Sequence, residues 1–136
     1  MTKPTVSGLC LLGVPFKSSE TDMAQPHIKS GQKADISPFG DQLSEKRSVA
    51  LLKTQHLEVI RLVLKTGQTI PPHKLSGNIT IQCIEGKLNI SLASSSIELE
   101  AGELAFLESD LSHGVTALEA SSALVTIAFT DTPMPA

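Results

Sequence analysis

The sequence predicts an all-β fold, a compact sandwich or barrel of short strands. From about Val49 onward, short runs of alternating apolar and polar residues are separated by Gly, Ser, Pro or Asp. No helical periodicity of useful length occurs after residue 49. Many short strands with frequent turn signals are typical of β-sandwiches and β-barrels. The chain of 136 residues is long enough for one domain with a sizeable core.

The run from 78 to 84 shows why these segments are expected to be strands. Successive side chains of a strand point to opposite faces, so a strand with one buried face alternates apolar and polar residues. The same alternation returns in 87–92, in 97–100 after a turn at 94–96, and in 125–130. In the first run one face would carry Ile79, Ile81 and Cys83, and the other Asn78, Thr80 and Gln82.

Residues 1–48 are less regular, with several Pro, Gly and Ser and no sustained period of either kind. We expect an N-terminal arm rather than a separate module, because the segment is small for an independent core. One or two strands, for example over Val6–Val14, would pair with an open sheet edge of the same barrel or of a neighbouring subunit. The barrel would span residues 49–130, and 131–136 would form a C-terminal tail.

Charge and apolar patterning exclude several classes of partner. The formal net charge is −3 and no run of Lys or Arg occurs, so we expect no nucleic acid and no anionic membrane as a partner. The apolar stretch Leu9–Phe16 is too short to span a bilayer and is followed by no signal-type cleavage site. A cytoplasmic location is therefore predicted.

The two cysteines, Cys10 and Cys83, lie far apart with no C-x-x-C spacing. This spacing argues against a structural zinc knuckle and against a redox motif. Because cytosolic thiols are kept reduced, we do not expect a disulfide between them.

Two glycine-bounded motifs have spacings that resemble those of the cupin superfamily. The first family motif runs G, five residues, H-x-H, three or four residues, E, six residues, G, and the second runs G, five residues, P-x-G, two residues, H, three residues, N. Fifteen residues separate the two motifs, as in small single-domain cupins. The matching positions are Gly67, His73, Leu75, Ile79 and Gly86 in the first motif and Gly102, Glu108, Asp110, His113 and Ala117 in the second.

The resemblance covers roughly residues 45–130 and implies a double-stranded β-helix, the cupin jelly-roll barrel, of the RmlC-like kind. It is similar to a branch of small bacterial single-domain cupins, and it implies a homodimer. The residues agree with this reading, since Gly67 and Gly86 permit the positive φ of tight turns. Alternation would point His73 into the barrel and Lys74 away from it.

The resemblance also implies a degenerate metal site. In metal-binding cupins two motif-one histidines, a glutamate and the motif-two histidine hold one ion inside the barrel. Only His73 and His113 match, because Leu75 and Ile79 occupy the other two positions and have no lone pair to donate. We expect no tightly bound metal, with a weakly held divalent ion such as zinc, iron, manganese or nickel as the alternative.

Further donors for such an ion are few. Cys83 shares the inward face with Ile79 but lies far along the strand, so a small buried hydrophobe is the favoured interpretation. His56 and Glu58 precede the first motif and could approach from a neighbouring strand, although we favour a surface position for His56 at a turn. His27 lies in the irregular arm and is expected to have no specific role.

Three classes of function remain open. The first is small-molecule binding, with the polar end of the ligand held by His73 and His113. The second is a metal-dependent cupin enzyme, of dioxygenase or isomerase type, with a divergent ligand set, and a metal-free epimerase is disfavoured because the chain has no tyrosine. The third is a non-catalytic structural or regulatory barrel. The predicted pocket is lined by Leu75, Ile79, Ile81, Cys83, Leu88 and Phe106.

Overall fold

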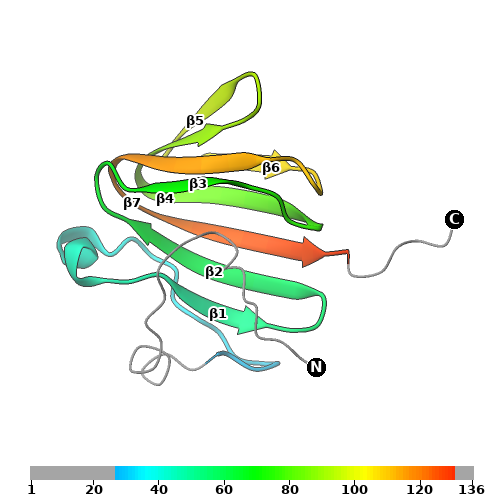
Figure 1. The fold of residues 1–136 in the computed structure, drawn as a ribbon. Coiled ribbons are helices and arrows are strands. Elements are labelled where there is room, and N and C mark those ends of the chain that lie inside the picture. The colour runs from blue at the N-terminus through cyan, green and yellow to red at the C-terminus, as the bar shows by residue number, and fades with distance from the viewer. Residues whose placement is uncertain (1–26, 131–136) are drawn as a thin grey trace, which may run out of the picture.

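A computed structural model describes residues 27–130, and these form a small β-barrel preceded by an irregular segment (Figure 1). The barrel contains seven strands in one sheet that folds over on itself. A short 3-10 helix, η1 (Gly40–Glu45), precedes it. The strands are β1 (Val49–Lys53), β2 (Leu57–Leu64), β3 (Thr69–His73), β4 (Gly77–Ser91), β5 (Ser96–Glu100), β6 (Leu104–Leu107) and β7 (His113–Phe129).

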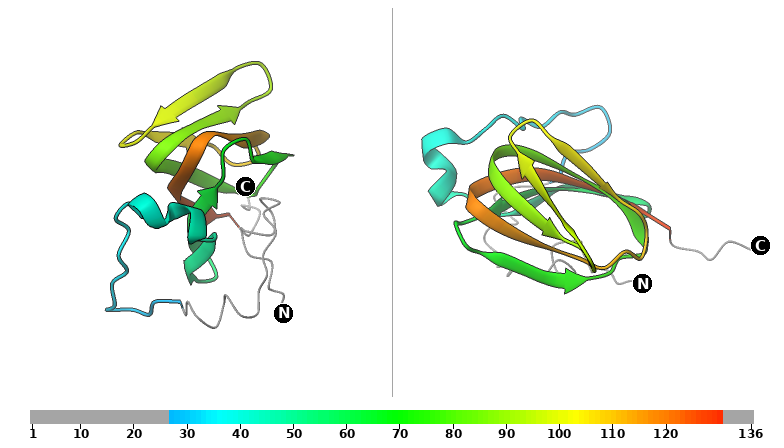
Figure 2. Two further views of the ribbon diagram at one scale, coloured as in Figure 1. Left: turned by 90° about the vertical axis from the view of Figure 1, so that its left-hand side faces the viewer. Right: turned by 90° about the horizontal axis from the view of Figure 1, so that it is seen from above.

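The two long strands, β4 and β7, build both faces of the barrel. They pair antiparallel from Gly77 with Phe129 to Ser91 with Gly114. On one face, β2 pairs with the C-terminal half of β7, β1 pairs with β2, and β6 pairs with the N-terminal half of β4. On the other face, β3 pairs with the start of β7 and β5 with the end of β4. Figure 2 shows the two faces opposed across the core.

The long strands turn from one face to the other at a corner where the β4–β7 register is interrupted. Shifts in register lie between Cys83 and Leu88, and bulges of this kind bend a strand and increase its twist. Gly86 at this corner has a φ of 87°. A Cβ there would lie 2.2 Å from the carbonyl oxygen of Ala120, so the corner requires glycine. The predicted positive φ of Gly67 and Gly86 is confirmed.

The core is aliphatic and follows the alternation expected from the sequence. The inward residues of β4 are 0–2% exposed, whereas Asn78 and Gln82 on the other face of the strand are exposed. The all-β prediction is therefore confirmed at the level of fold class and of facing residues. The buried cluster contains Ile60, Leu62, Leu64, Ile70, Leu75, Ile79, Ile81, Cys83, Leu88, Ile90, Leu99, Ala105, Leu107, Val115, Ala117, Ala123, Val125 and Ile127.

Phe106 does not line the interior, contrary to the prediction. It lies on β6 opposite Thr80 and is 59% exposed, and Leu104 on the same face is 61% exposed. The inward residues of β6 are Ala105 and Leu107, which are both buried. The facing of β6 differs by one residue from the prediction, and a shift of one residue moves every side chain to the opposite face.

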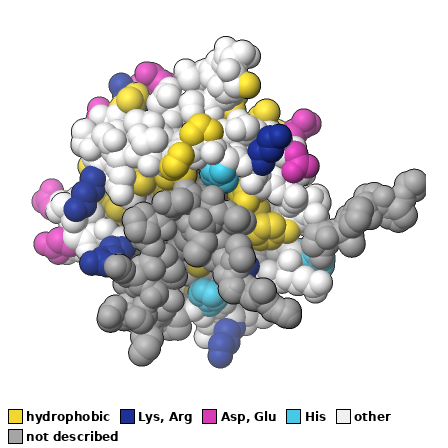
Figure 3. Space-filling view, viewed as in Figure 1, with side chains coloured by type: hydrophobic (Ala, Val, Ile, Leu, Met, Phe, Trp, Pro, Cys, Tyr) yellow, Lys and Arg dark blue, Asp and Glu magenta, His cyan; other side chains and the backbone are white. Residues whose placement is uncertain are grey.

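Hydrophobic side chains reach the surface in patches, with charged side chains toward the margins of one face (Figure 3).

The segment before the barrel is ordered along the outside of the sheet. The backbone N–H of Ile28 donates to the carbonyl oxygen of Leu51 at 2.8 Å, and η1 lies beside the corner of the barrel (Figure 1). His27 is exposed. The strand predicted over Val6–Val14, Cys10 and the tail 131–136 lie outside the described residues. Among residues 27–130, no helix is long and apolar enough to cross a membrane.

Candidate functional site

The two motif histidines lie opposite each other at the end of β3 and the start of β7. His73 and His113 are partners in the β3–β7 register. Pro71 and Pro72 have no N–H to donate, and the register is interrupted between Ile70 and His73 for this reason. The imidazole ring centroids are 4.6 Å apart, with an interplanar angle of 50°. The pairing of β3 with β7 thus brings together two histidines that are forty positions apart in the sequence.

Each imidazole is held by a backbone carbonyl two residues before it. Nδ1 of His73 lies 3.2 Å from the carbonyl oxygen of Pro71, and Nδ1 of His113 lies 3.0 Å from that of Leu111. A carbonyl oxygen only accepts, so both Nδ1 atoms carry the hydrogen and donate it. In a neutral imidazole the second nitrogen is then an acceptor. Both rings therefore present an Nε2 lone pair.

Both Nε2 atoms are buried, and neither has a hydrogen-bond partner among residues 27–130. Burial lowers the pKa of His113 below its ordinary value, and the nearby His73 lowers it further, against an opposing contribution from the hydrogen bond to Leu111. The ring of His113 is therefore neutral at pH 7. Leu75 and Lys74 follow His73 with the predicted facing, since Leu75 is 4% exposed and Lys74 is exposed.

The residues present do not fit the four-ligand metal site that the resemblance implies. His73 and His113 offer two lone pairs, but Leu75 and Ile79 are 4% and 2% exposed members of the aliphatic core. Within residues 27–130, no group of three or more His, Cys, Asp or Glu could hold an ion. Catalytic zinc sites normally have three protein ligands. No chemical step through a metal is supported by this donor set.

The other candidate donors lie elsewhere. Cys83 is buried on the inner face of β4, where its Sγ is 3.5 Å from the carbonyl oxygen of Glu85 and burial raises the pKa of its thiol. Glu58 is buried on β2 opposite Ile127, and its Oε1 is 3.9 Å from Nζ of Lys53. His56 is exposed in the turn before β2. None of the three joins the histidine pair in a potential ion-binding group.

The loop before His113 is fixed to the loop after His73. The backbone N–H of Asp110 donates to the carbonyl oxygen of Leu75 at 2.8 Å, and the N–H of Ser109 donates to Oδ1 of Asn78 at 3.0 Å. Asp110 has a φ of 66°, at a motif position where the cupin pattern has glycine. Aspartate tolerates this left-handed conformation better than most residues. These contacts hold the two histidines in register.

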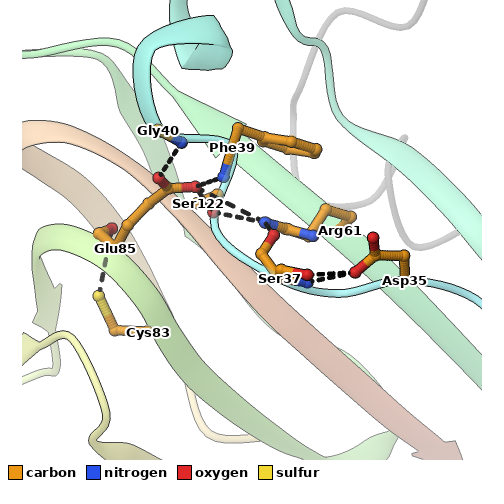
Figure 4. Close-up of polar contacts among 8 residues, drawn as sticks. All are labelled: Asp35, Ser37, Phe39, Gly40, Arg61, Cys83, Glu85 and Ser122. Atoms are coloured by element: carbon orange, nitrogen blue, oxygen red, sulfur yellow. Dashed lines mark hydrogen bonds and ion pairs between the residues drawn. The ribbon is translucent and has the colours of Figure 1, made fainter.

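A second polar cluster, which the sequence analysis missed, lies at the corner of the barrel (Figure 4). Nη2 of Arg61 donates to Oγ of Ser122 at 3.0 Å and lies 3.6 Å from Oε2 of Glu85. Oγ of Ser122 donates to the same carboxylate oxygen at 2.5 Å. Arg61, one of two charged residues in the otherwise apolar strand β2, is the signal that could have identified it, because such a residue is rarely buried without a partner.

This corner cluster binds the segment before the barrel. The backbone N–H groups of Phe39 and Gly40 donate to Oε2 and Oε1 of Glu85 at 2.9 and 3.1 Å. Nη2 of Arg61 also donates to the carbonyl oxygen of Ser37 at 2.8 Å, and its guanidinium lies 4.0 Å from the centre of the Phe39 ring. Burial alone would raise the pKa of Glu85, but these hydrogen bonds and the charge of Arg61 lower it overall.

Comparison with solved structures identifies proteins with a similar fold. A cupin superfamily protein from Desulfitobacterium hafniense is 13% identical over 60% of this chain and 75% of that one, with a TM-score of 0.59. An RmlC-like cupin from Desulfovibrio desulfuricans is 26% identical over 75% and 97%, with a TM-score of 0.56. A conserved protein of unknown function from Streptococcus pyogenes is 19% identical over 80% and 99%, with a TM-score of 0.64. No family model and no curated protein matches the chain.

Proposed function

We propose that this protein, which is a cupin of the RmlC-like kind by its fold, binds a small molecule in the barrel through His73 and His113. The observation that carries the proposal is the pair of buried Nε2 atoms that have no hydrogen-bond partner within residues 27–130, on rings whose centroids are 4.6 Å apart. A fold alone does not define a function, so the proposal rests on this site.

A buried hydrogen-bond acceptor without a partner has a free-energy cost. A buried polar atom without a partner destabilises the protein by about 1–3 kcal/mol, which a suitable donor recovers. Two such atoms on neighbouring rings, each ring fixed by a backbone carbonyl, form a preorganised binding element. Convergent polar groups in an otherwise apolar interior are typical of small-molecule sites.

The proposal is tested by the imidazole nitrogens themselves. Protein labelled with 15N-histidine is titrated with a library of small metabolites, and the Nε2 resonances of His73 and His113 are followed. A ligand should shift both resonances in a saturable way and raise the melting temperature, and both effects should be lost in His73→Leu and His113→Leu. His56→Ala is the matched control, because His56 is exposed in a turn. A library without any compound that shifts these resonances would refute the proposal.

Elemental analysis of the untagged protein distinguishes the small-molecule proposal from the metal-dependent alternative. Two imidazoles with no third donor should hold little zinc, iron, manganese or nickel after growth with these metals. Near-stoichiometric metal that is lost in both His73→Leu and His113→Leu would replace the small-molecule proposal with an enzyme-type metal centre. The homodimer and the cytoplasmic location stay predictions.

A further inference from the structure

We infer that the group bound by His73 and His113 is uncharged and donates two hydrogen bonds, one to each Nε2, as a primary amide or a vicinal diol does. This inference rests on the proposed function and specifies the chemistry of its ligand. It follows from three features of the site: the direction of hydrogen bonding, the proximity of the two rings, and the finding that no third His, Cys, Asp or Glu of residues 27–130 groups with the pair.

The direction of hydrogen bonding is set by the backbone. Pro71 and Leu111 each stand two residues before the histidine whose Nδ1 they fix, so the two halves of the site have the same local arrangement. Because both Nδ1 hydrogens are donated to carbonyl oxygens, both Nε2 atoms accept. The site therefore offers two acceptors and no imidazole donor.

The spacing of the rings suits one small group. The ring centroids are 4.6 Å apart at an interplanar angle of 50°, so the rings are neighbours, and the inference assigns one ligand group to both Nε2 atoms. Hydrogen bonds from N–H or O–H donors to such acceptors span about 2.7–3.2 Å. One amide NH2, or two hydroxyls on adjacent carbons, supplies two hydrogens at this separation.

Charged ligands fit the site less well. A carboxylate or phosphate brings only acceptors toward two acceptors, and Lys74, the nearest cation in the sequence, is exposed on the opposite side of the chain. A cation would find lone pairs but no carboxylate with them, since no third Asp, Glu, His or Cys of residues 27–130 groups with the pair. A buried charge without an opposite charge is costly. An uncharged donor avoids both the contact of acceptor with acceptor and the cost of a buried charge.

Acetamide and acetate provide the test, because they have nearly the same shape and opposite hydrogen-bonding character. Each is titrated into 15N-histidine-labelled full-length protein, and the tautomers are first assigned from long-range 1H–15N spectra. We expect both rings to carry the hydrogen on Nδ1. Acetamide should then shift both Nε2 resonances with a dissociation constant in the millimolar range, as its few atoms allow. Acetate should bind at least tenfold more weakly.

Variants and a third probe complete the experiment. His113→Leu should abolish the response of His73 to acetamide, whereas His56→Ala should leave it unchanged. Zinc is titrated alone as the cationic probe and should not saturate the pair at one equivalent.

Several results would overturn the inference. These are a hydrogen on either Nε2, acetate binding equal to or tighter than acetamide, no acetamide response within its solubility, or saturation by one equivalent of zinc. Library compounds that bind through both histidines but are anionic would refute the uncharged ligand and leave the proposed function standing. A library without any binder would refute the proposed function itself.

Discussion

The corner cluster, between the barrel and the segment before it, and the histidine pair both contain buried polar groups, and they differ in how their polar atoms are satisfied. Both carboxylate oxygens of Glu85 accept hydrogen bonds, from Ser122 and from two backbone N–H groups, and Arg61 lies against them. The histidine pair satisfies one nitrogen of each ring, and the other nitrogen has no partner in the described part of the chain.

The difference separates structural polar groups from binding groups. Among residues 27–130, Nε of Arg61 is buried without a hydrogen-bond partner, whereas Nη2 donates to Ser37 and Ser122. Its effect is to hold residues 37–40 against the barrel. The histidine pair holds no segment in place, because its hydrogen bonds reach only two residues back. Its two Nε2 acceptors, which lack a partner within residues 27–130, are the basis of the proposed ligand binding.

The largest expected effect comes from completing the histidine pair as a metal site. The double substitution Leu75→His and Ile79→Glu places donors at the two motif positions that lack them. We expect zinc affinity to rise by orders of magnitude, because four ligands replace two. Zinc content and the metal-dependent rise in melting temperature measure it. Unchanged zinc binding in a folded double variant would show that these positions do not converge with the histidines.

Gly86→Ala should cause the largest loss of stability. Its Cβ would lie 2.2 Å from the carbonyl oxygen of Ala120, at a φ of 87°. Backbone displacement and left-handed strain together should lower the free energy of unfolding by about 4 kcal/mol. Gly67→Ala is the control, since its φ is 83° and no atom lies within 4 Å. Gly67→Ala should lower the free energy of unfolding, measured in urea, by only about 1 kcal/mol. Equal losses would show that the corner is not tightly packed.

Arg61→Ala tests the corner cluster directly. Removing one partner of a buried ion pair costs about 3–5 kcal/mol, and we expect about 3 kcal/mol because Glu85 keeps 15% exposure and its other hydrogen bonds. Lys87→Ala provides the comparison, because its pair with Glu100 is exposed. That variant should change urea stability by less than about 1 kcal/mol. A small effect of Arg61→Ala would remove the contrast between the two clusters.

His113→Leu should behave in the opposite way. The substitution removes a buried acceptor without a partner in the described residues and also the hydrogen bond from Nδ1 to the carbonyl oxygen of Leu111, two effects of opposite sign and similar size. We expect the free energy of unfolding to change by less than about 1 kcal/mol, or to rise. A loss of 3 kcal/mol or more in urea unfolding would show that the histidine pair is structural in the same sense as Arg61.

The pH dependence of stability should show the smallest effect. Burial lowers the pKa of His113 in the folded state from an ordinary value near 6.5. The contribution of neutral His113 to the free energy of unfolding is therefore complete above pH 6.5. It is lost as the pH falls from 6.5 to the folded-state pKa, because the unfolded chain takes up the proton first. The slope is at most about 1.4 kcal/mol per pH unit. His113→Leu should flatten urea stability in this window, and an unchanged profile would assign the dependence to other groups.

The sequence predicted the fold well because alternation and glycine spacing are local properties. The inward facing of Ile79, Ile81 and Cys83 follows from a period of two, and the positive φ of Gly86 from a tight turn. Phe106 shows the limit of that reasoning. A four-residue strand is too short to fix its phase by pattern, so the facing of β6 depends on its register with β4.

The sites were harder to predict because they depend on contacts between distant segments. Motif spacing identified His73 and His113, but not that both rings would be fixed through Nδ1. The corner cluster joins Arg61 of β2 with Glu85 of β4 and with residues of the irregular segment. No local pattern connects these elements. Only the paired register of β2, β4 and β7 brings them together.

The long pairing of β4 with β7 also has a consequence for folding kinetics. It joins Gly77 to Phe129 and Ser91 to Gly114, so most of the barrel's central contacts are far apart in sequence. Chains dominated by such non-local contacts fold in roughly milliseconds to seconds, because the entropy of a long loop is lost before the contacts form. The hairpin of β4 with β5 can form early, but the barrel closes only when β7 arrives, the last strand along the described chain.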